Sequence, residues 1–194
     1  MSELPKGWRE EKLFSCAKPT KGKKPKILQE RVADGFAPYI DIKAFEFGQI
    51  RQYAEISSSK ITTPDDILMV WDGARSGLVG RGFYGAIGST IVALKPTNVI
   101  KEYLYYFLWC KYDYINTTSQ TTIRHLPQDR LVEIEIPLPP LPEQEEIFRR
   151  VNELFALADK IEQRYKTAKA QLARAEKAIY AKAFRGELVR QVEE

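Results

Sequence analysis

The sequence predicts an α+β (mixed α/β) globular domain over residues 1–140, one long coiled-coil α-helix over residues 141–186, and a C-terminal tail over residues 187–194. Three observations support this prediction. Before the border, short apolar runs alternate with turn residues. After it, no glycine or proline occurs from Glu143 to Arg185. Along that second stretch, apolar residues recur every 3.5 residues on average, which is the period of a coiled-coil seam.

In the first part, short apolar runs bounded by turn residues indicate four strands, because β-strands are short and are commonly interrupted by glycine, proline and asparagine or aspartate. The clearest is the last, in which Val132, Ile134, Ile136 and Leu138 alternate with polar residues and Pro137. The stretch from Ile100 to Ile115 lacks glycine and proline and is expected to be a helix. The four candidate strands are Pro38–Ile42, Ile67–Trp71, Ile87–Leu94 and Leu131–Leu138.

The second part carries signals for both ends of a helix. Pro142 suits the first helical position, where the missing N–H removes no hydrogen bond. Glu143 and its acidic neighbours place negative charge in the first turn, which the helix dipole favours. Arg185 and Gly186 are a cation and a stop signal at the other end. At 1.5 Å per residue the helix is roughly 65 Å long, which exceeds what a small domain covers.

The apolar residues of this helix follow alternating intervals of four and three. This spacing predicts that the seam pairs with a helix of another chain. The alternative is that the helix folds back on its own domain. The predicted dimer or subunit interface consists of Ile147, Val151, Leu154, Ala158, Ile161, Tyr165, Ala168, Leu172, Ala175 and Ile179.

Composition limits the classes of function only loosely. The formal net charge is +4, from 30 basic and 26 acidic residues, which permits nucleic-acid binding without arguing for it. A run of lysines without an acid suits phosphate neutralisation, although a solvated lysine loop explains it equally well. Two cysteines are too few for a disulfide framework or a zinc site, and the sequence has no long apolar run or secretion signal, so a cytoplasmic location is expected. The run contains Lys18, Lys21, Lys23, Lys24 and Lys26.

Gly80 to Gly85 match the G-x-G-x-x-G pattern of dinucleotide-binding loops. That pattern requires a helix N-terminus directly after it, whereas Gly85 leads into an apolar run that indicates a strand. The glycines are therefore interpreted as loop and turn residues. A second interpretation is that Arg75, Ser76 and Arg81 lie on this loop and face DNA, since arginine can bond both major-groove acceptors of guanine.

The segment from Thr117 to Leu126 is unusually polar, and its residue types are those that contact phosphates and base edges. Gln120, Thr121 and Arg124 are candidate DNA contacts, with the glutamine suited to adenine and the arginine to guanine. A capped surface loop is the alternative. His125 is the only histidine and has no partner for catalysis or metal binding nearby in the sequence. The aromatic residues between Tyr103 and Tyr114 are interpreted as core rather than as base-stacking groups.

Several segments resemble, in order along the chain, the specificity subunits of type I restriction-modification systems. The run Ile134-Glu-Ile-Pro-Leu-Pro-Pro-Leu-Pro-Glu-Gln144 resembles the junction between a target-recognition domain and the family's conserved helix. Leu4–Trp8 resembles the opening of such a domain, Asp66–Gly77 its central strand and loop, and Ala181–Leu188 the end of the helix. Members of the family usually carry two domains and two helices, whereas this chain has one of each.

The resemblance implies a non-catalytic subunit that reads double-stranded DNA, with one recognition domain for one half of a bipartite site. It implies that the helix docks modification (methyltransferase) subunits, and that a motor and nuclease subunit joins them. S-adenosylmethionine, ATP and magnesium are then expected only on these partners, with no cofactor or metal in this chain. A single domain and helix imply an antiparallel homodimer that reads a palindromic, interrupted site.

Two other functions stay open at this point. A structural coiled-coil scaffold would bind no specific DNA sequence. A metal-dependent nuclease would use carboxylates such as Asp65, Asp66 and Asp72, but the lysine that normally follows such a pair is missing here. The sequence also lacks the proline-rich motif of adenine methyltransferases and a phosphate-binding loop with lysine. These absences argue against an enzyme.

Overall fold

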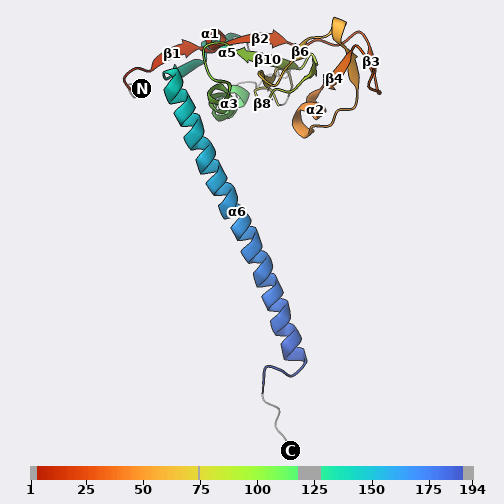
Figure 1. Ribbon diagram of the computed structural model, residues 1–194, viewed down its shortest axis with the longest axis vertical. Coiled ribbons are helices and arrows are strands. Elements are labelled where there is room, and N and C mark those ends of the chain that lie inside the picture. The colour runs from red at the N-terminus through yellow and green to blue at the C-terminus, as the bar shows by residue number, and fades with distance from the viewer. Residues whose placement is uncertain (1–3, 74, 118–127, 190–194) are drawn as a thin grey trace, which may run out of the picture. The chain divides into compact units, whose positions relative to one another are not determined.

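The computed structural model describes residues 4–73, 75–117 and 128–189. The chain divides into a compact unit, Met1–Phe148, and a second unit, Arg149–Glu194, each of which is described by itself. The first unit contains strands and helices and the second is helical, which confirms the mixed α/β domain followed by a long helix (Figure 1). Within the described ranges, none of the helices combines the length and apolar character that a membrane crossing requires.

A four-stranded antiparallel sheet forms the centre of the first unit. Its strand order is β2 (Ala17–Lys21), β10 (Ile91–Pro96), β7 (Ile67–Val70) and β8 (Val79–Arg81). Alternate residues of β7 enter different clusters, with Ile67 and Met69 on one face and Leu68 on the other. Both faces of β7 are therefore buried, which explains why its sequence is a continuous apolar run rather than an alternating one.

Two further sheets complete the first unit. The five-stranded sheet has the order β3 (Leu28–Gln29), β5 (Tyr53–Glu55), β4 (Phe36–Ile40), β9 (Gly85–Ile87) and β6 (Ile61–Thr62). The third sheet pairs β1 (Arg9–Lys12) with β11 (Glu135–Leu138), which ties the start of the domain to its end. The short helices of the unit are α1 (Leu13–Cys16), α2 (Ile42–Phe47), the 3₁₀ turn η1 (Ile56–Ser58), α3 (Lys101–Cys110), α4 (Tyr112–Thr117) and α5 (Gln128–Glu133).

Three of the expected elements differ from the structure. The expected strand over residues 87–94 is two strands, because the chain leaves the five-stranded sheet after Ile87, turns at Gly88 and enters the central sheet at Ile91. The expected strand over residues 38–42 ends two residues earlier. There, the Asp41 carboxylate accepts a hydrogen bond from the Ala44 N–H at 2.8 Å and caps α2.

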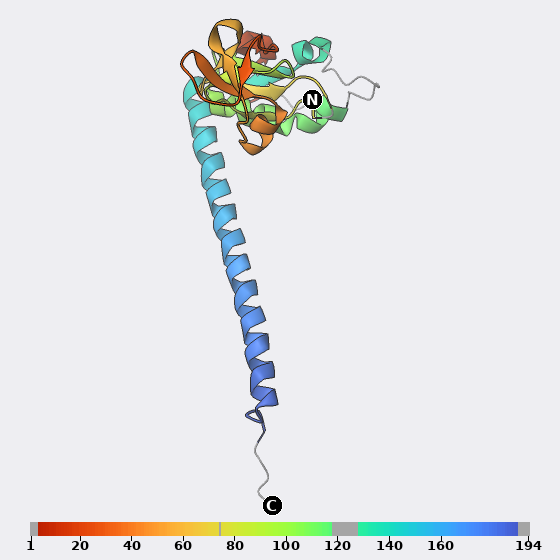
Figure 2. The ribbon, with the colours of Figure 1, turned by 90° about the vertical axis from the view of Figure 1, so that its right-hand side faces the viewer.

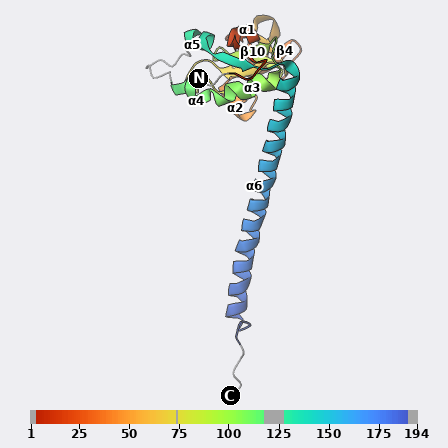
Figure 3. The same ribbon diagram turned by 90° about the vertical axis from the view of Figure 1, so that its left-hand side faces the viewer.

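The prediction of a strand over residues 131–138 is wrong in its first half, where the chain is the end of helix α5. Leu131 and Ile134 are buried, and their three-residue spacing is helical, whereas Val132 is 51% exposed. Strand β11 itself begins at Glu135, and its buried residues Ile136 and Leu138 keep the two-residue spacing of a strand. The expected helix over residues 100–115 is confirmed as helical but is interrupted at Lys111, and Figure 3 shows α3 and α4 following one another along the domain.

The long helix α6 covers Leu141–Phe184, 44 residues without interruption (Figure 2). It begins and ends within two residues of the expected bounds. Gly186 follows it with φ +73°, the left-handed conformation that ends many helices. Its first two turns, through Phe148, group with the compact domain, and the rest belongs to the second unit.

Candidate nucleic-acid interface

Cationic side chains gather at one edge of the central sheet. Strands β2 and β7 both run antiparallel to β10, so their C-terminal ends lie at the same edge. The lysine run begins on β2 and continues beyond its C-terminal end there, and the turn of the β7–β8 hairpin follows β7. Lys23 and Lys24 are exposed, and the backbone N–H of Lys23 is held by the carbonyl of Ile87. We call Lys21, Lys23, Lys24 and Arg75 the basic edge.

Lys21 is the most constrained member of the basic edge. Its Nζ lies 3.3 Å from Oδ2 of Asp72 and 5.4 Å from the centre of the Trp71 ring. A carboxylate and an aromatic face on the same ammonium group hold it in one position. Lys21 also lines a shallow hollow of about 230 Å³ together with Phe14, Pro19, Trp71, Val92 and Val132.

The β7–β8 turn is fixed by backbone and side-chain contacts. The Gly77 N–H donates to the Val70 carbonyl at 2.8 Å, and the Asn116 side chain donates to the Ser76 carbonyl at 3.0 Å. Gly77 has φ +90°, and a Cβ there would lie 2.7 Å from a methyl carbon of Ile115. Glycine is therefore required at this position for both backbone conformation and space.

Ser76 is placed differently from its exposed neighbour Arg75. Its side chain is fully buried, and its Oγ has no hydrogen-bond partner among the described residues. A buried hydroxyl does not suit the direct contact with DNA that was expected for Ser76. Arg75 is the neighbouring residue that is exposed, with 59% of its side chain accessible and its Nη1 3.4 Å from Oε1 of Glu46.

Arg81 also departs from the expected arrangement. It pairs with Ile67 at the end of the hairpin opposite the turn, so it does not share a loop with Arg75. Its guanidinium lies 5.4 Å from the centre of the Tyr105 ring on α3. Arg81 is exposed and remains a candidate contact, but it is separate from the basic edge.

Gln120, Thr121 and Arg124 lie outside the described residues, as does His125. Their segment follows α4 directly, and Asn116 near the end of that helix contacts the β7–β8 turn. The polar segment therefore starts beside the turn that carries Arg75.

The glycines between Gly80 and Gly85 have a packing role. A Cβ on Gly82 would lie 2.3 Å from the Thr63 carbonyl oxygen, and a Cβ on Gly80 would lie 2.5 Å from the Phe45 ring. The segment leads into strand β9 rather than into a helix, so the requirement for a dinucleotide-binding turn is not met.

The candidate carboxylates do not converge on one point. Asp66 is buried and accepts hydrogen bonds from Thr62 and Thr63, whereas Asp72 faces Lys21. In the described ranges no three His, Cys, Asp or Glu side chains are grouped as metal ligands would be. The aromatic side chains of α3 are mostly partly buried against the core, although Trp109 on α3 and Tyr114 on α4 are each 54% exposed.

The start of α6 is anchored by a buried amide that the sequence interpretation did not single out. Gln144 is 1% exposed, its Oε1 accepts from the Ile100 N–H at 3.0 Å, and its Nε2 donates to the Pro139 carbonyl at 2.8 Å. The Trp8 indole N–H donates to the Glu143 carboxylate at 3.0 Å. These bonds join the first turn of α6 to three separate segments of the domain.

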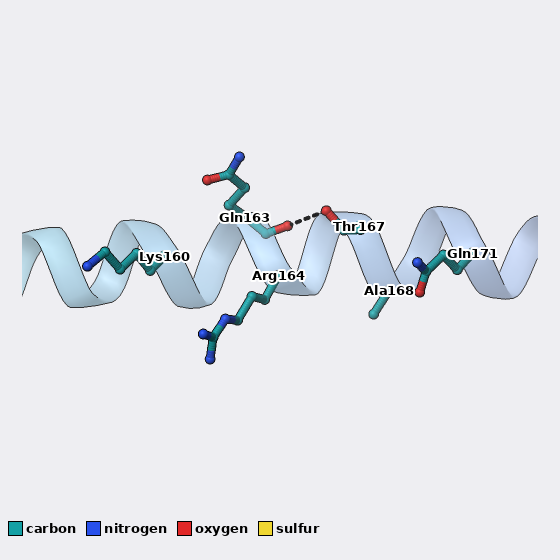
Figure 4. A pocket seen from close by; sticks show the side chains of 6 residues that line it. All are labelled: Lys160, Gln163, Arg164, Thr167, Ala168 and Gln171. Carbon is teal, nitrogen blue, oxygen red and sulfur yellow. Dashed lines mark hydrogen bonds between the residues drawn. The ribbon is translucent and has the colours of Figure 1, made fainter.

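The apolar seam of α6 is exposed from Leu154 onward, whereas Ile147 and Val151 are partly buried. Leu154, Ile161, Leu172 and Ile179 are 66%, 59%, 61% and 56% exposed. Figure 4 shows the small Ala168 among the longer side chains of Lys160, Gln163, Arg164 and Gln171, where the surface of the helix is hollowed. Exposed large apolar residues in this pattern indicate a surface for another helix.

Comparison with known proteins gives a consistent result. Residues 5–170 match the family model described as the type I restriction modification DNA specificity domain. The chain is 30% identical over 185 residues to the type I restriction enzyme MjaVIII specificity subunit of Methanocaldococcus jannaschii, covering 93% of this chain and 43% of that protein. It is 50% identical over 76 residues to the EcoDI specificity subunit of Escherichia coli, covering 39% of this chain and 17% of that protein.

Solved structures show the same fold. A chain from a study of the assembly and conformational transition of the type I R-M system superposes with a TM-score of 0.77 at 26% identity, covering 96% of this chain and 48% of that one. The HsdS subunit from Thermoanaerobacter tengcongensis superposes with a TM-score of 0.74 at 24% identity, covering 96% and 47%. The present chain thus spans less than half the length of the proteins that it matches along nearly its whole sequence.

Proposed function

This chain belongs to the family of type I restriction-modification DNA specificity domains, and on that premise we propose that it reads one half of a bipartite DNA site. The observation that carries the proposal is the basic edge, where two chain segments bring cations to one end of a rigid sheet. Lys21, Lys23 and Lys24 neutralise phosphates and position the domain. Arg75 contacts base edges.

Arg81, Gln120, Thr121 and Arg124 are further proposed contacts. The polar segment that contains the last three begins next to the β7–β8 turn, which supports a shared surface with Arg75. Ser76 is left out because its side chain is buried. The chain itself performs no chemistry in this proposal. S-adenosylmethionine-dependent methylation belongs to modification subunits that dock on α6, and ATP- and magnesium-dependent cleavage belongs to a motor and nuclease subunit.

We propose that a second copy of the chain pairs with α6 in the antiparallel direction. The seam supports this because it is nearly symmetric about Gln163, so an antiparallel pair centred there places like residues opposite one another. Two alanines then lie opposite each other and allow close approach of the backbones. The layers are Ile147 with Ile179, Val151 with Ala175, Leu154 with Leu172, Ala158 with Ala168, and Ile161 with Tyr165.

Charge favours the same direction. The first two turns of α6 carry Glu143 and Glu145, whereas its last two turns carry Lys177 and Lys182, and Arg185 follows the end of the helix. An antiparallel pair sets the acidic end of each helix beside the basic end of the other. A parallel pair would set like charges side by side, which is unfavourable.

A gel-shift titration at two salt concentrations, with and without a modification subunit, tests the DNA-binding function. Replacing Lys23 and Lys24 by alanine removes about two phosphate contacts, so the slope of log K against log salt is expected to fall by about 1.8. The matched control replaces Lys6 and Lys12, exposed lysines away from the basic edge. Assembled complex without sequence preference would instead support a structural scaffold, and DNA cleavage by the chain alone with magnesium would support a nuclease.

A further inference from the structure

The β7–β8 turn presents Arg75 from a rigid base. The Ser76 N–H donates to the Gly73 carbonyl at 3.1 Å, and the Leu78 N–H donates to the Arg75 carbonyl at 3.0 Å. Asn116 holds the same turn from α4. These bonds hold the backbone of the turn at the Arg75 carbonyl and at Ser76, so the direction of the Arg75 side chain depends mainly on what lies beside it.

A carboxylate from another element restricts the direction of the Arg75 side chain. Glu46 lies on α2, its side chain is only 9% exposed, and its Oε1 is 3.4 Å from Nη1 of Arg75. Oε1 of Glu46 has no hydrogen-bond partner among the described residues. The cation that lies beside it is the guanidinium of Arg75. Helix α2 is itself fixed, because Asp41 caps it and Phe45 packs over Gly80 of β8.

A carboxylate removed from water is strongly stabilised by a nearby cation, and the loss of that cation is costly. Glu46 therefore holds one arm of the Arg75 guanidinium. The arginine side chain remains 59% exposed and its fork has further N–H donors, which leaves it able to meet a planar pair of acceptors. The O6 and N7 atoms of guanine are such a pair in the major groove.

Resting on the proposed function, we propose that Glu46 is a positioning residue that aims Arg75 at a guanine of the DNA target. The pair then determines one base of the recognised sequence. A phosphate partner is less well matched, because the neighbouring carboxylate offsets part of the charge of the arginine. Lys23 and Lys24 have no ion pair among the described residues and suit phosphates better.

The test selects bound duplexes from a randomised library with the chain assembled with its modification subunit. Wild type is expected to prefer guanine at the position that Arg75→Ala no longer discriminates. Glu46→Gln, which keeps the shape but removes the charge, is expected to lower this preference roughly 5- to 50-fold, within the range of one bidentate base contact. Glu46→Asp is expected to restore part of the preference for guanine. The double variant Glu46→Gln with Arg75→Ala is expected to lose no more of this preference than Arg75→Ala alone.

The control Glu10→Gln removes the same charge from an exposed position on β1 and leaves the preference unchanged. The salt dependence of Glu46→Gln stays that of wild type. A wild-type preference profile for Glu46→Gln would overturn the inference, and so would a loss of preference at all positions together with a lower melting temperature. If Arg75→Ala lowers the salt slope by about 1 without changing any base preference, the arginine binds a phosphate and the inference is wrong. A wild-type complex without any base preference would refute the proposed function itself.

Discussion

The antiparallel register proposed for α6 makes a quantitative prediction about distances between two copies. If the two-fold axis of the pair lies at Gln163, the two copies of any other residue are displaced from one another along the helices. This axial offset is twice 1.5 Å for each residue between that position and Gln163, because both helices contribute. Gln163, Ala170 and Lys177 are spaced one heptad apart and lie on the same outer face of the helix, so their sideways separation is similar. The expected axial offsets are about 0, 21 and 42 Å.

Nitroxide labels on single cysteines measure these offsets by pulsed electron resonance. The background variant is Cys110→Ser, because Cys110 is exposed whereas Cys16 is buried. Distances are expected to rise steadily from Gln163 to Lys177. The control is the double variant Leu154→Lys with Leu172→Lys. In the proposed register it places a lysine of each copy opposite a lysine of the other in two layers of the seam, so the helices should separate and the dipolar signal should disappear.

A parallel pair would give similar distances at all three labelled positions. A register shifted by a heptad would move the shortest distance away from Gln163. Absence of any dipolar signal, with a monomer by light scattering at the same concentration, would refute pairing of two copies altogether. In the proposed register, the two Leu141 residues lie about 66 Å apart along the axis, which sets the spacing of the helix starts.

Three further predictions concern the domain. Gln144→Ala removes both hydrogen bonds of a buried amide and is expected to lower the free energy of unfolding by about 2–4 kcal/mol in urea, against less than about 0.5 kcal/mol for the exposed Gln163→Ala. Burial, and next a neighbouring carboxylate, raise the pKa of Tyr103 from 10.0 to about 12, so the neutral side chain stabilises the fold below pH 10 and this contribution is lost as the pH rises towards 12. The unfolding free energy of wild type should therefore fall more steeply over that range than that of Tyr103→Phe, and equal slopes would contradict the assignment. Gly77→Ala places a Cβ against Ile115 at φ +90°, and thermal unfolding should show a loss of about 1–3 kcal/mol.

The sequence predicted those elements whose stability is local. Helix α6 could be recognised because it lacks glycine and proline and repeats its apolar residues in heptads. Strand β7 could be recognised because a strand buried on both faces is apolar throughout. Its position was right to within one residue.

Elements that depend on distant partners were missed. Strands β3 and β6 have only two residues each and exist because β5 and β9 pair with them. The change of sheet between Ile87 and Ile91 follows from two different partners, β4 and β7, and leaves no local signal beyond Gly88. The candidate site was also only partly predictable. The burial of Ser76 depends on packing against distant segments, which the neighbouring residues in the sequence do not indicate.

The positions of the acids explain more about the cations than the net charge of +4 does. Lys21 lies beside Asp72 and Arg75 beside Glu46, so each holds a fixed direction but offers less net charge to a phosphate. Lys23 is exposed without an ion pair among the described residues, so it retains its full charge and its freedom. The salt dependence of DNA binding should therefore come mainly from the untethered lysines, and base preference from the tethered arginine. Lys23 and Arg75 carry the same formal charge at the basic edge. They are expected to differ in function because only Arg75 has a buried carboxylate, that of Glu46, beside it.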